Sequence, residues 1–232
     1  MANWFLGRAL AEEAETENAA WSFLGEGAAF WVTVAVLLVV GVAVYLVTRK
    51  KSSKKSFWTA KTMAVGAMCM ALSSVLSLIK LWSMPMGGSV TPASMLPLLL
   101  FAYCYGVGPG MVLGALYGVM QFVLDGGAWA ALGLIPNLLD YPIAFGLLGL
   151  AGCFRGSKAK MTASFVLGCF GRFMASFLSG FIFYGQYAPE GVNPVWYSLT
   201  YNGSYMLVEC IICIALGLLV GERLAKELKK VA

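Results

Sequence analysis

The sequence predicts an all-α polytopic membrane protein. Three observations support this prediction: the composition, the length of the apolar runs and the placement of the charges. Of the 232 residues, 60% are hydrophobic and only 12% are charged, which is more apolar surface than a water-soluble domain of this size needs. The apolar runs are long enough to cross a bilayer, which takes about 20 residues of helix. Basic residues gather in short clusters between these runs, so the net charge of +5 reflects membrane topology and does not indicate nucleic acid.

Residues 1–56 are expected to form an N-terminal extension with one extra transmembrane helix. Residues 28–48 carry no charge and are almost wholly apolar, and at 1.5 Å per residue they would form about 31 Å of helix. Five basic residues follow within positions 49–55 and mark a cytoplasmic loop. This orientation places the N-terminus outside the cell.

Residues 57–232 are expected to form a second domain of six membrane helices. The expected spans are 57–81, 92–105, 111–124, 133–153, 161–184 and 195–220, joined by loops that include 82–91, 106–110, 125–127 and 185–194. Thirteen of the sixteen Lys and Arg residues fall on the predicted cytoplasmic side, and the exceptions are Arg8, Lys80 and Arg172. The positive-inside rule therefore supports seven spans and a cytoplasmic C-terminus.

Two of these spans, 92–105 and 111–124, are short and interrupted. Prolines and glycines at positions 92, 97, 106, 108 and 109 break the apolar pattern. Broken segments are tolerated in a bilayer only where protein or a cavity covers their backbone. The pattern therefore predicts a cavity towards the outer side of the bundle.

Asp140 places a carboxylate in a run that is otherwise uncharged and mostly apolar from Ala128 to Phe154. An ionisable group at membrane depth costs roughly 2.5–3.5 kcal/mol on insertion scales, and it usually faces a cavity or a partner. Tyr141, an aromatic with a polar tip, follows it directly. We interpret this stretch as one wall of a pocket for a polar, cationic small molecule. The alternative is an ion pair with a basic residue on a neighbouring helix.

Arg172 and Glu209 also place charges inside the core spans. The guanidinium presents a planar fork of donors that suits hydroxyl, carboxylate or phosphate oxygens. Arg172 could therefore meet a ligand, or it could form a bridge to Asp140 or Glu209. For Glu209 we prefer a structural hydrogen-bonding role.

Aromatic residues are dense around the last external loop and the helix after it. They are Phe183, Tyr184, Tyr187, Trp196, Tyr197, Tyr201 and Tyr205. They could form the aromatic belt of a membrane interface, or a cage whose faces hold a cation or a flat ring at roughly 0.5–2 kcal/mol per contact. Spacing does not separate these two. Tyr197 and Asn202 are five positions apart, so a pocket that used both would require an irregular start to their helix.

The composition argues against several chemistries. The chain has no histidine, the commonest metal ligand and general base, so we expect no metal centre and no catalytic nucleophile of the Ser/His or Cys/His kind. It has no GxxxxGK[ST] loop for nucleotide hydrolysis. The six cysteines lie in apolar segments, and the CxxC at 210–213 has no second pair, which is typical of packing residues. We expect a protein that is not an enzyme and that carries no cofactor.

The first core helix carries alanines at 60, 64, 67 and 71, in steps of four, three and four that form one smooth face. Faces of small residues allow helices to approach closely. This face could pack within the bundle or dock on another membrane protein, and its spacing leaves both open.

Several separated motifs together resemble a known family. They are LWSMPMGGSVT at 81–91, SMLP at 94–97, LDYPIAF at 139–145, FYGQYAP at 183–189 and YSLTYNG at 197–203. They resemble, over roughly residues 57–222 and in unbroken order, the thiamine-specific S component of energy-coupling factor (ECF) transporters, the ThiT or YuaJ type. The predicted helix at 28–48 lies outside that resemblance.

The resemblance implies a six-helix substrate-binding subunit in the bacterial plasma membrane that captures thiamine from outside. It also implies partners, which are a transmembrane coupling subunit and two cytoplasmic ATPases. In the family an alanine-rich face of the first core helix docks on the coupling subunit, and Ala60, Ala64, Ala67 and Ala71 match that face.

The resemblance also implies a set of ligand-binding residues. The family's acidic position, which binds the aminopyrimidine, falls on Asp140, and its basic and stacking aromatic positions fall on Arg172 and Tyr184. The other matched positions are Tyr141, Tyr197 and Asn202. Two departures concern the thiazolium contacts. Ser176 stands where some members have His, and Gly88 stands where some have a stacking Trp, although Trp82 is near.

Two other functions fit the same residues. The chain could be an S component for another flat vitamin or precursor, such as free hydroxymethylpyrimidine. It could also be a stand-alone secondary transporter in which Asp140 is a protonation site, although no inverted repeat is obvious in the sequence.

Overall fold

The computed structural model describes residues 59–84, 87–125, 134–189 and 191–231, and every structural statement below concerns these residues. The extra helix predicted at 28–48 and the basic loop after it lie outside them. The boundary between an extension at 1–56 and a domain at 57–232 therefore stays a prediction.

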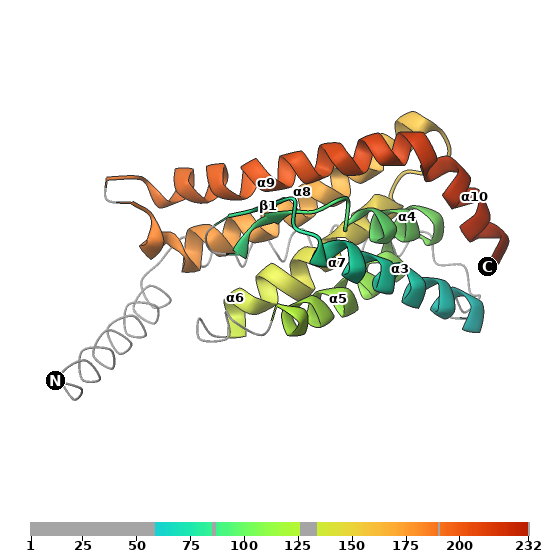
Figure 1. Cartoon of the computed structure of the whole chain (residues 1–232), viewed down its shortest axis with the longest axis horizontal. Helices are drawn as coiled ribbons and strands as arrows, with labels where there is room; N and C mark the ends of the chain where they lie inside the picture. Colours follow the sequence, from blue (N-terminus) through green and yellow to red (C-terminus); the bar gives the residue numbers. More distant parts are fainter. Residues whose placement is uncertain (1–58, 85–86, 126–133, 190, 232) are drawn as a thin grey trace. The chain divides into compact units, whose positions relative to one another are not determined.

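Helices make up nearly all of the described chain (Figure 1). The longer ones are α3 (Ala60–Leu78), α4 (Leu96–Tyr105), α5 (Val107–Leu124), α8 (Lys158–Phe183), α9 (Pro194–Leu216) and α10 (Glu222–Val231). Between α5 and α8 lie α6 (Leu134–Leu138), η3 (Leu139–Ile143), α7 (Ala144–Leu147) and η4 (Leu148–Gly152), which follow one another without a break. The short helices η5 (Gly185–Tyr187) and η6 (Gly217–Gly221) precede α9 and α10.

The predicted six-span core is confirmed within the described residues. Five helical stretches are long and apolar enough to cross a membrane, and α4 is a shorter apolar helix. Every residue of α4 from Leu96 to Cys104 is buried, so surrounding protein covers the short span, as its broken pattern predicts. Helix α5 is longer than predicted, because Gly108 and Pro109 belong to its first turn. The predicted turn at 106–110 shrinks to Gly106, whose φ of 109° suits glycine.

The predicted external loop at 82–91 contains a small antiparallel hairpin. Strands β1 (Trp82–Ser83) and β2 (Ser89–Val90) pair with Trp82 opposite Val90. Two more backbone hydrogen bonds extend the pairing, from Leu81 N to Val90 O at 2.9 Å and from Met84 N to Gly88 O at 2.7 Å. The described ends of this loop, 81–84 and 88–90, are therefore joined by regular backbone pairing.

A face of glycines on α5 brings that helix into backbone contact with the segment from η3 to η4. A Cβ at Gly114 would overlap the carbonyl oxygen of Phe145, and one at Gly118 would overlap that of Tyr141. A Cβ at Gly110, one turn earlier, would lie 3.0 Å from the Cα atom of Gly149. Glycine is required at such contacts because any side chain would separate the two backbones. This contact fixes the position of the turn that carries Asp140 and Tyr141.

That turn is π-helical. In η3 the amide N–H of Ala144 donates to the carbonyl of Leu139, five residues back. Pro142 lies inside the turn and has no N–H to donate, which favours a local widening of the helix. Asp140 and Tyr141 therefore lie on a widened turn in the middle of the bundle.

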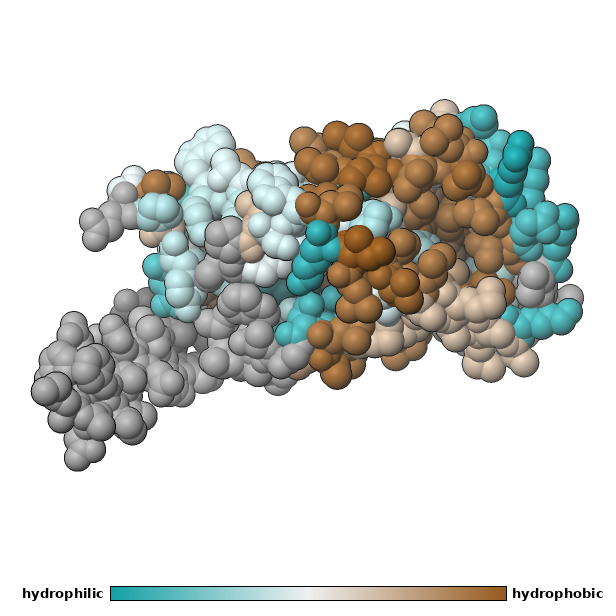
Figure 2. Space-filling model, in the orientation of Figure 1, coloured by the Kyte–Doolittle hydropathy of each residue, from teal (hydrophilic) through white to brown (hydrophobic). Residues whose placement is uncertain are grey.

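The visible exterior of the described chain carries a broad apolar band (Figure 2). Large hydrophobic side chains are exposed on α3 and from α9 to η6, among them Met68, Leu72, Leu207, Ile211 and Leu219. Strongly hydrophilic residues border the band at the C-terminal end of the chain, and a paler, more polar surface borders it on the other side. An apolar belt of this kind fits a lipid bilayer.

The glycine face of α5 yields a stability prediction. Gly118→Ala should lower the free energy of unfolding by about 1–3 kcal/mol, because the added methyl group forces α5 away from the Tyr141 backbone. Thermal unfolding of the purified protein measures the change. Gly108→Ala on the same helix is the matched control, since among the described residues no atom beyond its chain neighbours and the nearby backbone of α5 lies within 4 Å of its Cβ position. Equal unfolding midpoints for the two variants would contradict the proposed tight contact.

Candidate ligand-binding cavity

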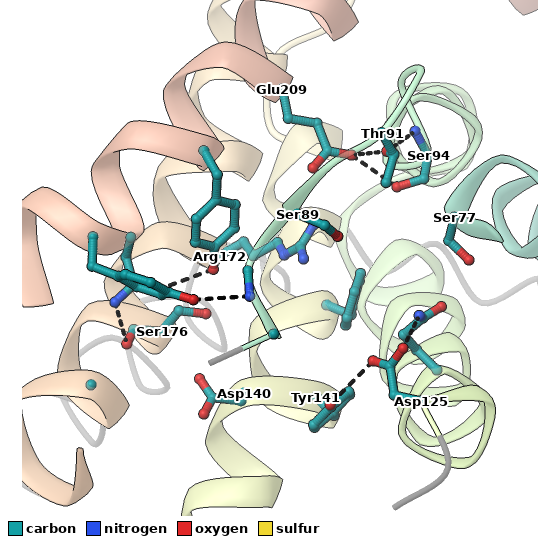
Figure 3. Close-up of a pocket in the computed structure, with 18 of the residues that line it drawn as sticks. Ser77, Ser89, Thr91, Ser94, Asp125, Asp140, Tyr141, Arg172, Ser176 and Glu209 are labelled. Carbon is teal, nitrogen blue, oxygen red and sulfur yellow. Dashed lines mark hydrogen bonds between the residues drawn. The ribbon is translucent and has the colours of Figure 1, made fainter. Parts of the chain in front are cut away.

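A cavity of about 150 Å³ opens between η3, α8, α9 and the hairpin segment (Figure 3). Seven of the eight predicted ligand residues line it, namely Asp140, Tyr141, Arg172, Ser176, Tyr184, Tyr197 and Asn202. Trp82 does not. It lies on β1 with 54% of its surface exposed, outside the lining of the cavity.

Asp140 points from η3 towards α8. The Ser179 hydroxyl donates to its Oδ2 at 2.7 Å, and the hydroxyls of Ser176 and Tyr184 lie close to the same carboxylate. Arg172, Ser176 and Ser179 follow one another at steps of four and three, which places them on one face of α8. Ser179 was not predicted as a site residue, although its spacing from Arg172 indicates that both lie on the same face of α8.

Arg172 lines the cavity without an ion pair in the described part of the chain. Its guanidinium carbon lies 4.1 Å from the centroid of the Phe145 ring, a cation–π contact. Its Nε and Nη1 are buried and have no hydrogen-bond partner among the described residues. The single ion pair recorded there joins Lys230 to Glu227, so the predicted alternative of a bridge from Arg172 to Asp140 or Glu209 is wrong.

Helix α9 supplies an aromatic wall. Tyr197, Tyr201 and Tyr205 are four residues apart and line the cavity, with ring centroids 6.0 Å and 5.9 Å apart along the series. Trp196, by contrast, is 63% exposed. The structure thus separates the two interpretations of the aromatic cluster, because these tyrosines fit a cage and Trp196 fits the belt.

The expectation of an irregular start to this helix is wrong. Helix α9 is regular from Pro194 onwards, and the side chain of Asn193 caps it by accepting from Val195 N at 2.8 Å. Tyr197 and Asn202 both line the cavity because it contacts a wide face of α9, including Ser198 between them.

Asn202 is 6% exposed, and both polar atoms of its side-chain amide form hydrogen bonds within the protein. Its amide Nδ2 donates to the carbonyls of Ser198 and Ser176 at 3.1 and 3.3 Å, and its Oδ1 accepts from the Tyr205 hydroxyl at 3.1 Å. The side chain therefore joins α8 to α9 and orients the ring of Tyr205.

Gly88 lies against this aromatic wall. Its amide N–H donates to the Tyr201 hydroxyl at 3.0 Å, and a Cβ there would lie 2.8 Å from that hydroxyl oxygen and 3.0 Å from the Tyr205 ring. The position at which some relatives are expected to carry a stacking Trp thus has no room for a side chain in this arrangement.

Asp125, predicted only as part of an external turn, is a further carboxylate at the cavity. The Tyr141 hydroxyl donates to its Oδ2 at 3.1 Å, and Gln121 Nε2 donates to its Oδ1 at 3.2 Å. Tyr141 therefore points towards α5, away from Asp140, its neighbour in sequence. The spacing of four between Gln121 and Asp125 is a signal that a sequence analysis could use.

The charges that line the cavity favour a cation. Asp125, Asp140 and Glu209 are opposed by Lys80 and Arg172, which leaves one net negative charge. Directly after the last residue of α8, burial and the Asp140 carboxylate raise the pKa of Tyr184 well above its usual range, so its phenol stays neutral at ordinary pH. Charge and aromatic faces together suit a cationic, flat molecule.

The fold and the cavity thus define a helical membrane protein that binds a small molecule within its bundle. The chain belongs to the thiamine transporter protein family Thia_YuaJ, whose sequence profile matches residues 63–228. It is a bacterial membrane protein, and a transporter rather than an enzyme.

Three relatives illustrate the similarity. The chain is 40% identical over 145 residues to the thiamine transporter ThiT of Bacillus subtilis (strain 168). This match covers 56% of this chain and 73% of that protein. It is 33% identical over 134 residues to ThiT of Lacticaseibacillus paracasei, covering 52% and 67%. The solved structure of ThiT from Listeria monocytogenes shares the fold, with a TM-score of 0.62 at 20% identity over 72% of this chain and 96% of that one.

The buried guanidinium yields a prediction for the ligand-free protein. Arg172→Met should raise its free energy of unfolding by about 1–2 kcal/mol, because it removes a charge whose Nε and Nη1 have no partner. Thermal unfolding without ligand measures this. Lys158→Met, at an exposed position on the same helix, controls for the loss of a positive charge. Lower stability of Arg172→Met would show that the cation–π contact outweighs the unmet donors.

Proposed function

We propose that this chain captures thiamine outside the cell, as the substrate-binding subunit of an ECF-type importer in the bacterial plasma membrane. The observation that carries the proposal is the carboxylate of Asp140, which lies inside the bundle beside cavity-lining tyrosines. Membership of the thiamine transporter family supports the substrate. The ThiT names of the two curated relatives support it independently of the cavity.

The chemistry of thiamine suits the cavity. Thiamine is a cation with two flat rings, so it needs a negative partner and aromatic faces. Asp140, next to the hydroxyls of Ser176 and Tyr184, would bind the aminopyrimidine, and the ring of Tyr184 would stack on the ligand. Tyr197 would supply a second face, and Arg172 would donate to a ligand acceptor. Trp82 is left out of this proposed site because it does not line the cavity.

Asp140→Asn should weaken thiamine binding about 100-fold, which corresponds to about 2.8 kcal/mol. The substitution keeps the shape and the acceptor for Ser179 but removes the charge that attracts the cation in a medium of low dielectric. Quenching of tryptophan fluorescence by thiamine measures the affinity. Asp140→Glu restores the charge and should bind better than Asp140→Asn, and Glu222→Gln on α10, away from the cavity, should leave the affinity unchanged. Unaltered affinity of Asp140→Asn would remove Asp140 from the site.

A competition panel separates thiamine from the precursor alternative. If both rings contribute, free hydroxymethylpyrimidine should compete far less well than thiamine, because it lacks the cationic thiazolium that the cavity charge favours. Equal competition would assign the protein to the precursor. Mass spectrometry of the ligand that copurifies with the protein gives an independent answer.

Coupling to a transmembrane subunit and two cytoplasmic ATPases is the second part of the proposal. The predicted docking residues Ala60, Ala64, Ala67 and Ala71 are all exposed on α3, which supports docking over packing within the bundle. The basic residues of α10 favour a cytoplasmic C-terminus. With the C-terminus in the cytoplasm, the tyrosine-rich end of the described core faces the outside of the cell. If residues 28–48 span the membrane, the N-terminus also lies outside the cell.

Ala67→Trp should prevent copurification with the coupling subunit while leaving the affinity for thiamine unchanged. A bulky ring would keep a partner helix from approaching the alanine face. Leu72→Trp is the matched control, because Leu72 is 53% exposed on another side of the same helix. Thiamine uptake by liposomes that contain this chain alone, driven by a pH gradient, would contradict coupling and favour a secondary transporter.

A further inference from the structure

Glu209 ties α9 to the segment that joins the hairpin to α4 (Figure 3). Its side chain is 1% exposed. The hydroxyl of Thr91 donates to its Oε1 at 2.5 Å, and that of Ser94 donates to the same oxygen at 2.8 Å. The carboxylate also lines the cavity, although none of the sequence motifs assigns it a role in binding.

The segment held in this way has an unfavourable backbone conformation. Ala93 has a φ of 66°, a left-handed conformation that a residue with a Cβ rarely adopts. Thr91 supports the turn from inside, because its hydroxyl oxygen accepts from Ser94 N at 3.0 Å and its carbonyl accepts from Ala93 N at 2.8 Å. Strained backbone persists where surrounding contacts over-determine it. Here Thr91 joins the internal bonds of the turn to the buried carboxylate.

The second half of the hairpin and this segment together form a wall of the cavity, from Gly87 to Ser94. Gly87, Gly88 and Ser89 line it just before Thr91, and Gly88 is attached to α9 by its hydrogen bond to Tyr201. Tyr201 and Glu209 are eight residues apart, so the wall is attached to α9 at two points about two turns apart. Loss of the attachment at Glu209 would leave the wall held by the bond to Tyr201 and by the packing of the hairpin.

We propose that Glu209 is a positioning residue, which holds the wall from Gly87 to Ser94 against α9 and thereby slows the escape of the bound ligand. The inference rests on the proposed function only for the identity of the ligand. It assigns to Glu209 no contact with that ligand. Its effect is on dissociation, because the wall must move for the cavity to open on that side.

Thr91→Val tests the proposal, since it removes one of the two hydroxyls that donate to Glu209 at almost constant volume, and Thr91→Ser keeps that hydroxyl. We expect Thr91→Val to raise the dissociation rate of thiamine at least tenfold with little change in the association rate, and Thr91→Ser to remain within about threefold of the parent protein. Stopped-flow fluorescence measures both rates. Thr162→Val is the matched control, because the hydroxyl of Thr162 donates to Lys158 O on its own helix.

Limited trypsin digestion provides a readout that needs no ligand. Lys80 immediately precedes the hairpin and is exposed, so release of the wall should speed cleavage after Lys80 in Thr91→Val but not in Thr91→Ser or Thr162→Val. A lower unfolding midpoint of Thr91→Val with unchanged dissociation and cleavage would overturn the proposal, as would equal behaviour of Val and Ser at position 91. If the parent protein failed to bind thiamine, the proposed function would fall, and the cleavage rates would still show whether the bond between Thr91 and Glu209 holds the wall.

Discussion

A carboxylate without an ion pair, held inside a bundle of membrane helices, is the constraint on which the described structure depends. Asp140 has no cation within salt-bridge distance among the described residues, and its recorded hydrogen-bond donor is a serine on another helix. An ionisable group at this depth is tolerated only beside a polar cavity or a partner. The hydroxyls on the serine face of α8 and the tyrosines of α9 line the polar cavity beside this carboxylate.

The position of Asp140 is set by backbone contacts some distance from the cavity. The glycines of α5 allow the backbone of η3 to lie directly against that helix, and Pro142 favours the π turn that presents Asp140 to α8 and Tyr141 to α5. The two neighbouring residues therefore serve opposite sides of the bundle. One carboxylate faces the α8 hydroxyls, and the adjacent phenol is fixed by Asp125.

In the wall from Gly87 to Ser94, main chain lies where some family members are expected to place a stacking Trp side chain. With glycine at position 88, the backbone itself lies on the tyrosine wall and donates to Tyr201, so the main chain occupies a place that a large side chain would need. Asn202 is used mainly to join two helices, and Arg172 keeps unmet donors. Among the residues matched to the family, Arg172 therefore has buried donors without a described partner, whereas the polar atoms of Asn202 are bonded within the protein.

The sequence alone determined the membrane class and the six core spans, and it singled out Asp140 as a charge inside one of them. The thickness of a bilayer imposes the length and the apolar character of each span, and a charge inside such a span stands out for the same reason. Only the tertiary structure decided which way the side chains point. Tyr141 turns to Asp125, Thr91 reaches Glu209 across 118 positions of sequence, and Trp82 is carried out of the cavity. Such partners are chosen by the packing of helices far apart in the chain, and no local pattern of residues encodes that packing.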